Sequence, residues 1–293
     1  MFDPREWSHR RRDDLSRTFL VGCPRSGTTL LQSMLFAHPG VFSFPETFFF
    51  VKAFNLEGRR HRLGLAAEGA PEACRSVVSL GVAPRAPRKG LLPRTEVAYA
   101  RWFTGALDRA ARTAGARMWV EKTPTHLARV DLISRLVPGA RFVHMVRAGA
   151  PTVASLVQVT RDYPGEWGGE RDIEACAARW SRDVELSASH AGDPAHLFVS
   201  YERLVSDPAA VISALCAALE LEHDGPTVER MCSGYTGPAD RVSADEPWKA
   251  GITAPLVNRN AERLVRLFEP SERDRLHEML APAERRRAAL PFL

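Results

Sequence analysis

The stretch GCPRSGTT, residues Gly22–Thr29, lies between a short apolar run and a run with helical periodicity. In that setting, the backbone N–H groups of a loop and the positive end of a helix dipole bind phosphate oxygens. The spacing of Gly22 and Gly27 matches the P-loop pattern G-x-x-x-x-G-K-[ST], except that Thr28 occupies the lysine position. Arg25 can supply the missing charge, because a guanidinium offers two parallel donors to phosphate or sulfate oxygens. The stretch therefore predicts a loop that binds a phosphate or sulfate group without metal-assisted transfer of a γ-phosphate.

Four short apolar runs, rich in strand-forming residues, predict a sheet around this loop. Each run is nearly continuous in hydrophobicity and helical stretches separate them, which favours buried parallel strands with helices on both faces. The predicted fold class is therefore α/β, a three-layer, P-loop-NTPase-like parallel sheet flanked by helices. The predicted strands are Phe19–Gly22, Met118–Glu121, Phe142–Val146 and His196–Ser200. The predicted helices are Thr28–His38, Pro124–Val137, Pro151–Tyr163, Asp172–His190, Pro208–Leu219, Ala261–Phe268 and Ser271–Leu280, with a loop at 164–169.

One domain is predicted for residues 1–293, because this length suits a single large core. Residues 18–48 and 118–208 are predicted to form the ligand-binding core. Residues 49–117 carry many Gly, Pro and Arg residues and no clear strand, so we expect a mostly helical, variable insertion beside the site. Residues 282–293 are predicted to form a basic tail.

The composition is that of a soluble globular protein, at 45% hydrophobic and 26% charged residues. The formal net charge of +5 arises from 40 basic and 35 acidic residues, which favours an anionic ligand over a nucleic-acid partner. Five cysteines, without a CxxC pair, predict reduced and mostly buried thiols and no metal site. Residues 1–17 lack the apolar core of an export signal, and no apolar run approaches the roughly 20 residues of a membrane span. We therefore expect a cytoplasmic protein with no membrane span.

Four segments, in family order between residues 19 and 208, resemble the sulfotransferases that use 3′-phosphoadenosine 5′-phosphosulfate (PAPS). The resemblance is strongest to the branch that includes the tyrosylprotein sulfotransferases. The segments are PRSGTTLL at 24–31, similar to the 5′-phosphosulfate loop; VEKTP at 120–124, similar to a lysine-containing strand end; FVHMVR at 142–147 with Ser155, similar to the 3′-phosphate segment; and VSYERL at 199–204 with Pro208, similar to the next strand and its tyrosine.

The resemblance implies PAPS as the donor, 3′-phosphoadenosine 5′-phosphate (PAP) as the product, and no metal. Arg147 and Ser155 are implied to bind the 3′-phosphate. The family usually has R-D-x-R at this place, whereas this chain has RAGA at 147–150, so two polar contacts are expected to be missing. The segment at 244–249 loosely resembles one that closes over PAPS. The implied donor-binding residues are Arg25, Ser26, Gly27, Thr28, Thr29, Arg147, Ser155, Tyr201 and Lys249.

The implied catalytic residues are Glu46, Lys122 and Arg25. Glu46 follows Arg25 by 21 residues, which resembles the spacing of the general base in tyrosylprotein sulfotransferases, and its neighbouring phenylalanines are expected to raise the pKa of its carboxyl group. Lys122 is implied to stabilise the leaving group. His126 is the competing base, because cytosolic sulfotransferases use a histidine shortly after an equivalent lysine. His144 is predicted to be a core residue.

The predicted function is transfer of the sulfuryl group of PAPS to a hydroxyl of a small-molecule phenol or alcohol, as in secondary metabolism, by in-line displacement with Glu46 as general base. One alternative is a non-catalytic PAP-binding protein. Another is a nucleotide kinase with a degenerate P-loop. The sequence does not identify the acceptor or choose between Glu46 and His126, and it is compatible with a homodimer without fixing the oligomeric state.

Overall fold

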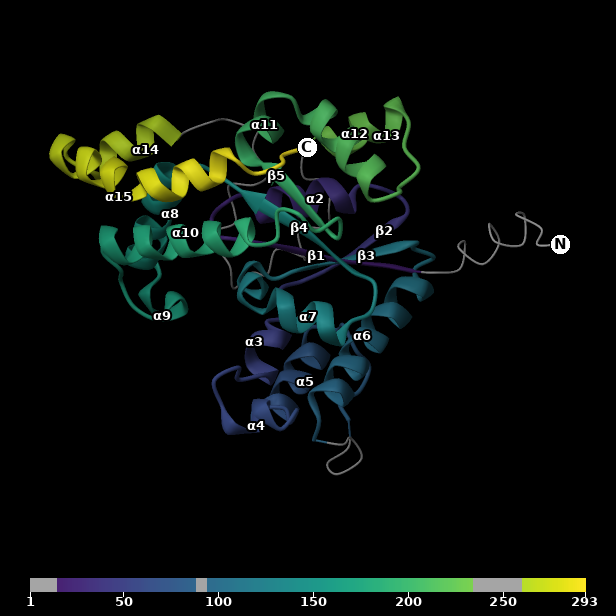
Figure 1. The fold of residues 1–293 in the computed structure, drawn as a ribbon. Coiled ribbons are helices and arrows are strands. Elements are labelled where there is room, and N and C mark those ends of the chain that lie inside the picture. Colours follow the sequence, from purple (N-terminus) through teal and green to yellow (C-terminus); the bar gives the residue numbers. More distant parts are fainter. Residues whose placement is uncertain (1–14, 88–93, 234–259) are drawn as a thin grey trace.

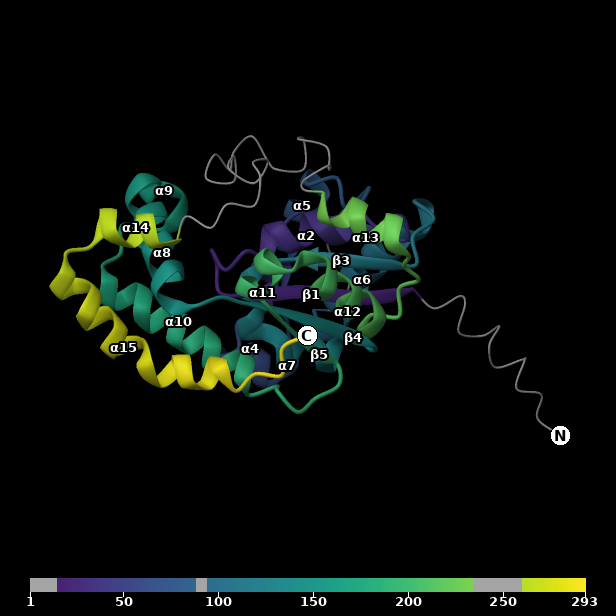
Figure 2. The same ribbon diagram turned by 90° about the horizontal axis from the view of Figure 1, so that it is seen from above.

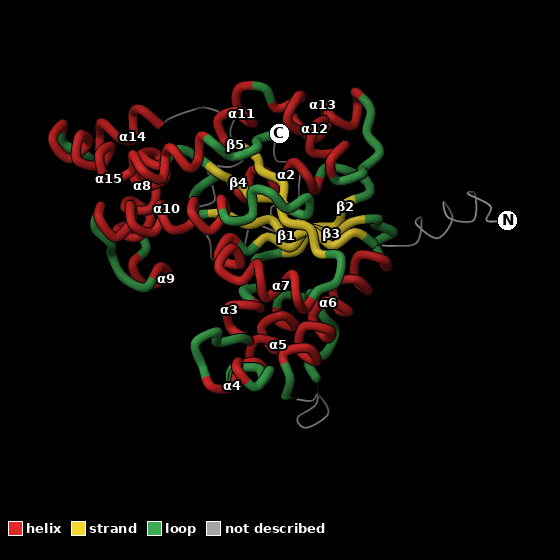
Figure 3. Tube along the Cα trace, viewed as in Figure 1, coloured by secondary structure: helices red, strands yellow, loops and turns green. Residues whose placement is uncertain are grey.

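The computed structural model describes residues 15–87, 94–233 and 260–293. Its centre is a five-stranded sheet with the strand order β2-β3-β1-β4-β5, and every neighbouring pair is parallel (Figure 1, Figure 3). The predicted fold class is confirmed. The strands are β1 (Ser16–Gly22), β2 (Val41–Phe44), β3 (Met118–Lys122), β4 (Ala140–Val146) and β5 (His196–Ser200).

Helices cover both faces of the sheet because the strands are apolar on both sides. Along the central strand β1, Phe19 and Val21 join the core below the sheet in Figure 1, whereas Leu20 joins the core above it. The upper layer contains α2 (Thr28–Phe36), α11 (Tyr201–Ser206), α12 (Pro208–Ala218) and α13 (Gly225–Cys232). The lower layer contains α3 (Phe49–Ala53), α4 (Arg59–Arg62), α5 (Ala70–Ser79), α6 (Glu96–Thr113), the 3-10 helix η2 (Pro124–Arg129) and α7 (Val130–Leu136).

A third group of helices lies beside the sheet rather than over it (Figure 2). Its core packs α8 and α10 against the two C-terminal helices around Trp180, Leu276 and Leu280. The group contains α8 (Gly149–Asp162), α9 (Pro164–Trp167), α10 (Ile173–Ala188), α14 (Asn260–Leu267) and α15 (Pro270–Ala288). None of the helices in the described part of the chain combines the length and the apolar content needed to cross a bilayer.

The segment predicted as an insertion is mostly helical where it is described, and it shares its core with the sheet. Phe49 stacks on Phe103 of α6, with ring centroids 4.2 Å apart, and Phe50 meets Phe19 of β1 edge to face. Both insertion phenylalanines are fully buried. The aromatic run after Pro45 therefore anchors α3 to the underside of the sheet.

Three local predictions differ from the structure. Residues 282–293 are not a basic tail: α15 continues to Ala288, and the amide of Leu293 donates to the carbonyl of Phe198 on β5 at 3.1 Å. The predicted loop at 164–169 begins with the single turn of α9. The helix predicted from Pro124 is split into η2 and α7. The five cysteines are free, and all but Cys232 are buried, as predicted.

Three histidines gather between β4, β5 and the chain just after α10. Nε2 of His144 lies 2.9 Å from Nδ1 of His196, and Nδ1 of His144 lies 3.2 Å from the Ser187 hydroxyl. The ring of His190 stacks on that of His196 with centroids 4.4 Å apart. His144 is a core residue, as predicted.

The surroundings of His144 and His196 disfavour protonation of their rings. Burial lowers the pKa of His144 well below its usual value, and the neighbouring His196 and His190 add to the effect. Burial and His190 lower the pKa of His196 to about 4, although Asp193 and Asp131 oppose the shift. The folded protein therefore holds the His144 and His196 rings neutral in mildly acidic solution.

We expect the free energy of unfolding to fall as the pH drops from about 6.5 to about 4, because the unfolded chain binds more protons than the folded one in this window. His196→Gln should reduce that loss by about 1–2 kcal/mol, measured by urea unfolding at about pH 7.5 and about pH 5. His277→Gln, which changes an exposed histidine of α15, is the control. Equal pH dependence in the wild type and His196→Gln would contradict the assignment.

Candidate functional site

The loop between β1 and α2 is folded tightly against the end of β4 and against Tyr201. A Cβ atom on Gly22, whose φ is 152°, would lie 2.4 Å from the carbonyl oxygen of Met145. A Cβ on Gly27, whose φ is 100°, would lie 2.5 Å from Cδ2 of Tyr201. The hydroxyl of Ser26 donates to the Met145 carbonyl at 3.0 Å. Both glycines are thus required sterically, and the Ser26 side chain serves the loop itself.

The first turn of α2 has the features of an anion site. Its N-cap is Gly27, which has no side chain to accept from the first amides, and no acidic residue lies in the first turn. The N-terminal amides and the helix dipole therefore favour an anion at this position. Thr28 and Thr29 open the helix, and Thr28 is buried.

Arg25 links the loop to α8 and to the end of β4. It adopts a left-handed backbone conformation, with φ 72°. Its Nε donates to the hydroxyl of Ser155 at 3.1 Å, and its carbonyl accepts from Nη1 of Arg147 at 3.0 Å. The Arg147 guanidinium lies over the ring of Tyr201, 4.2 Å from its centroid. The structure thus brings together four residues that the resemblance implied for the donor, from four segments of the chain.

Arg147 is almost completely buried. Burial lowers its pKa, while Tyr201 and Glu202 oppose that shift. Because a buried cation is stabilised by a charged hydrogen-bonding partner, this guanidinium is suited to an anionic ligand.

Lys122 stands between the phosphate loop and Glu46. Its side chain is almost fully buried, and its ammonium group is ion-paired with Oε1 of Glu46, 76 residues away in sequence, and lies 3.4 Å from the hydroxyl of Thr29. The two charged residues meet because β2 and β3 are parallel neighbours, so their carboxyl ends lie at the same edge of the sheet.

The surroundings of Glu46 differ from the apolar setting expected for it. Phe49 and Phe50 point into the core, whereas the Glu46 carboxylate is paired with Lys122 and keeps 14% of its side chain exposed. The ammonium stabilises the charged form of the carboxylate, so the expected apolar effect on Glu46 is opposed by this ion pair.

His126 is held in a buried network centred on Glu121. Its Nδ1 donates to the Glu121 carboxylate at 2.9 Å, and its Nε2 accepts the Phe50 amide at 3.2 Å. The hydroxyls of Thr47 and Thr123 donate to the same carboxylate at 2.7 and 2.6 Å. Both ring nitrogens of His126 are occupied and the residue has no exposed surface. This arrangement gives His126 a structural role.

Burial would raise the pKa of Glu121, but His126 and the Thr123 and Thr47 hydroxyls outweigh it and lower that pKa. Glu121 is therefore a satisfied buried carboxylate. Sequence reasoning missed this residue, although an acid inside an apolar strand followed closely by a threonine and a histidine is a detectable signal.

Two further observations concern Lys249 and a possible metal site. Lys249, implied for donor binding, lies outside the described residues, as does the segment at 244–249. Within the described ranges, no three His, Cys, Asp or Glu side chains gather as metal ligands would.

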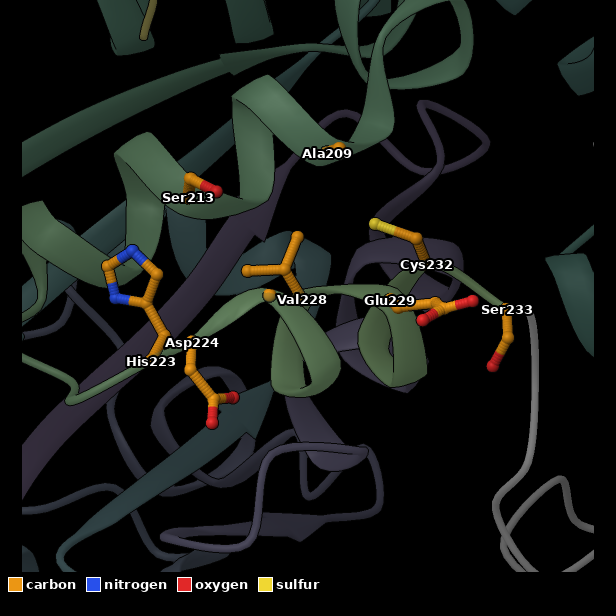
Figure 4. Close-up of a pocket in the computed structure, with 9 residues that line it drawn as sticks. Ala209, Ser213, His223, Asp224, Val228, Glu229, Cys232 and Ser233 are labelled. Carbon is orange, nitrogen blue, oxygen red and sulfur yellow. The ribbon is translucent and has the colours of Figure 1, made fainter.

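A pocket of about 690 Å³ lies elsewhere, between α12 and α13 (Figure 4). No residue predicted for the site lines it. Its lining consists of Ala209, Ser213, His223, Asp224, Gly225, Val228, Glu229, Cys232 and Ser233.

Two curated proteins match about three quarters of this chain. Protein-tyrosine sulfotransferase A of Caenorhabditis elegans is 26% identical over 234 residues, which cover 74% of this chain and 54% of the relative. Protein-tyrosine sulfotransferase 2 of Gallus gallus is 27% identical over 219 residues, covering 73% of this chain and 54% of the relative. The chain thus spans about half the length of these relatives.

Two solved structures share the fold. The sulfotransferase domain from the curacin biosynthetic pathway has a TM-score of 0.60 at 20% identity, covering 92% of this chain and 98% of the domain. The sulfotransferase domain of the Synechococcus PCC 7002 olefin synthase has a TM-score of 0.56 at 19% identity, covering 92% and 95%. The model of the sulfotransferase family matches residues 18–225, a range that contains the phosphate loop, Glu46, Lys122 and Arg147. This chain therefore belongs to the sulfotransferase family.

Proposed function

We propose that this protein transfers the sulfuryl group of PAPS to the hydroxyl of a small-molecule phenol or alcohol and releases PAP. The observation that carries the proposal is the buried Lys122, held between the Glu46 carboxylate and Thr29 at the start of α2. That placement puts a carboxylate and an ammonium beside an anion site. In-line sulfuryl transfer requires those groups at a loop that holds the 5′-phosphosulfate.

In the proposed reaction, the acceptor oxygen attacks the sulfur while Glu46 takes the hydroxyl proton. The bond between the sulfur and the bridging oxygen breaks, and its electron pair stays on the phosphate of PAP. Lys122 and Arg25 stabilise that developing charge, and the amides at the start of α2 hold the phosphosulfate oxygens. Atoms and charge balance without a further reactant.

Because Lys122 is paired with Glu46, binding of PAPS should also change how strongly Glu46 acts as a base. While the ammonium is paired with Glu46, it stabilises the carboxylate and weakens it as a base. A bound phosphosulfate competes for the ammonium, which lies within 3.4 Å of the Thr29 hydroxyl already. Donor binding therefore makes Glu46 a stronger base for the acceptor proton.

Discrimination for PAPS is proposed to come from the buried cation next to the loop. Arg147 and Ser155, which both contact Arg25, are positioned to bind a 3′-phosphate. The relatives named protein-tyrosine sulfotransferases favour a second acceptor class, the phenol of a tyrosine in a protein. The test therefore offers both small phenols and tyrosine peptides.

We expect Glu46→Gln to lower kcat about 100-fold or more on any accepted hydroxyl, because the amide cannot take the proton. Lys122→Ala should lower kcat by a similar factor, because the leaving oxygen loses its cation. Turnover is followed as the release of PAP. The affinity for PAP is measured by calorimetry. Glu57→Gln and Lys52→Ala, which alter exposed side chains of the same region, are the matched controls. Full turnover in either site variant would refute its assigned role.

If Glu46 is the base, His126 should stabilise the fold without taking part in proton transfer. His126→Ala should reduce the free energy of unfolding by about 2–4 kcal/mol, because it leaves the buried Glu121 carboxylate and the Phe50 amide short of a partner. His126→Asn keeps a donor close to the position of Nδ1 and should recover part of that stability.

Stability is measured by urea unfolding. The value of kcat is measured at a temperature at which both variants are folded. We expect kcat of His126→Asn to stay within a few-fold of the wild type. A large loss of kcat in His126→Asn with little loss of stability would make His126 the base and overturn the role of Glu46.

A further inference from the structure

The junction between β4 and α8 is fixed from outside the core sheet. The N-cap residue of α8, Ala148, has no polar side chain with which to cap the helix. Two carboxylates from distant parts of the chain accept hydrogen bonds from the amides at this helix start instead. The Ala148 amide donates to Oε1 of Glu202 at 2.9 Å, and the Gly149 amide donates to Oε1 of Glu284 at 2.6 Å. Glu202 belongs to α11, and Glu284 belongs to the C-terminal helix α15.

Arg287 joins the two carboxylates. Its Nε donates to Oε2 of Glu284 at 2.6 Å, and its Nη1 lies 3.6 Å from Oε2 of Glu202. We call Glu202, Glu284 and Arg287 the junction clamp. Its side chains are partly buried, with 36%, 31% and 21% of their surfaces exposed. The arginine offsets one of the two negative charges, which lowers the repulsion between the clamp and a nearby anion.

Packing fixes the same junction on its other side. A Cβ on Gly149 would lie 2.8 Å from Cδ1 of Leu280 on α15 and 2.9 Å from Cζ3 of Trp180 on α10. Nε1 of Trp180 donates to the carbonyl of Arg147 at 3.1 Å. Three consecutive residues, 147–149, are therefore each bonded or packed by a helix remote in sequence.

The residues proposed for the 3′-phosphate depend directly on this junction. Arg147 lies at its start, and its side chain reaches Arg25 and Tyr201. Ser155 lies in the second turn of α8, and its direction follows from the start of that helix. Because the amides of Ala148 and Gly149 are bonded to the clamp, these two amides do not bind the phosphate, and we assign its recognition to the Arg147, Ser155 and Arg25 side chains.

We propose that the junction clamp is a set of positioning residues for the 3′-phosphate of the donor nucleotide. Glu284 and Arg287 touch neither the nucleotide nor the reacting atoms. They hold the start of α8, and hence Arg147 and Ser155, at the distance that the phosphate requires. This inference rests on the proposed function, since it assumes that the site binds a 3′-phosphate.

The test compares PAP with adenosine 5′-phosphate, which lacks only the 3′-phosphate, by calorimetry on the full chain. We expect Glu284→Ala to weaken PAP binding about 10-fold and to change adenosine 5′-phosphate binding less than about 3-fold. Glu284→Gln keeps an acceptor for the Gly149 amide and should recover most of the PAP affinity. Arg286→Ala removes only a neighbouring exposed ion pair with Glu185 and should leave both affinities unchanged.

Selective loss of PAP affinity separates positioning from general damage to α15, which would weaken both ligands. Equal weakening of both nucleotides, or no change, in a folded Glu284→Ala protein overturns the inference. If Glu284→Ala does not fold, Arg287→Gln gives the same comparison through loss of the bridge to Glu202. A wild-type protein that binds PAP no more tightly than adenosine 5′-phosphate refutes the proposed 3′-site itself. If the wild type prefers PAP to adenosine 5′-phosphate and the variants keep the same preference, only the role of the clamp is refuted.

Discussion

The close approach of the phosphate loop to the end of β4 is the constraint on which the site depends. Gly22 lies against the Met145 carbonyl and Gly27 against the Tyr201 ring, at positions where a Cβ atom does not fit. This contact lets Arg25 reach Ser155 on α8 and accept from Arg147 at the end of β4. The loop and the proposed 3′-phosphate residues are therefore one connected unit.

The end of β3 supplies the other half of the site through strand alternation. Successive side chains of a strand point to opposite faces. Glu121 consequently enters the lower core, where it fixes the start of the insertion through Thr47 and His126, and Lys122 points toward Thr29 and α2. One strand end thus serves both structure and charge, and Glu46 reaches Lys122 because β2 pairs with β3.

The sequence predicted the parts of this arrangement that depend on local pattern. Continuous apolar runs revealed four of the five strands, and the glycine spacing revealed the loop. The strand β2 was missed because its four residues lead into an aromatic run without a strand-like period. The length of α15 was missed because Pro282 and a basic run suggested its end, although Ala283 and Leu290 are buried against the other helices.

Long-range contacts could not be predicted in the same way. The pairing of Lys122 with Glu46, the burial of His126 and the capping of α8 by Glu284 all require the strand order and helix packing, which no short motif encodes. The resemblance supplied the identity of several of these residues but not their partners. The setting of Glu46 is the clearest case, because its carboxylate is paired with the ammonium of Lys122, which lies 76 residues away in sequence.

In the proposed reaction, the phosphate loop, Lys122 and Glu46 together move a sulfuryl group. The most direct measurement is the stoichiometry of the wild-type reaction with PAPS, a panel of phenols and tyrosine peptides, and a metal chelator, with PAP and the sulfated product both quantified by mass spectrometry. We expect one sulfated hydroxyl for each PAP formed. PAP binding without a sulfated product on any acceptor, or turnover of ATP with Mg²⁺ in its place, would contradict it.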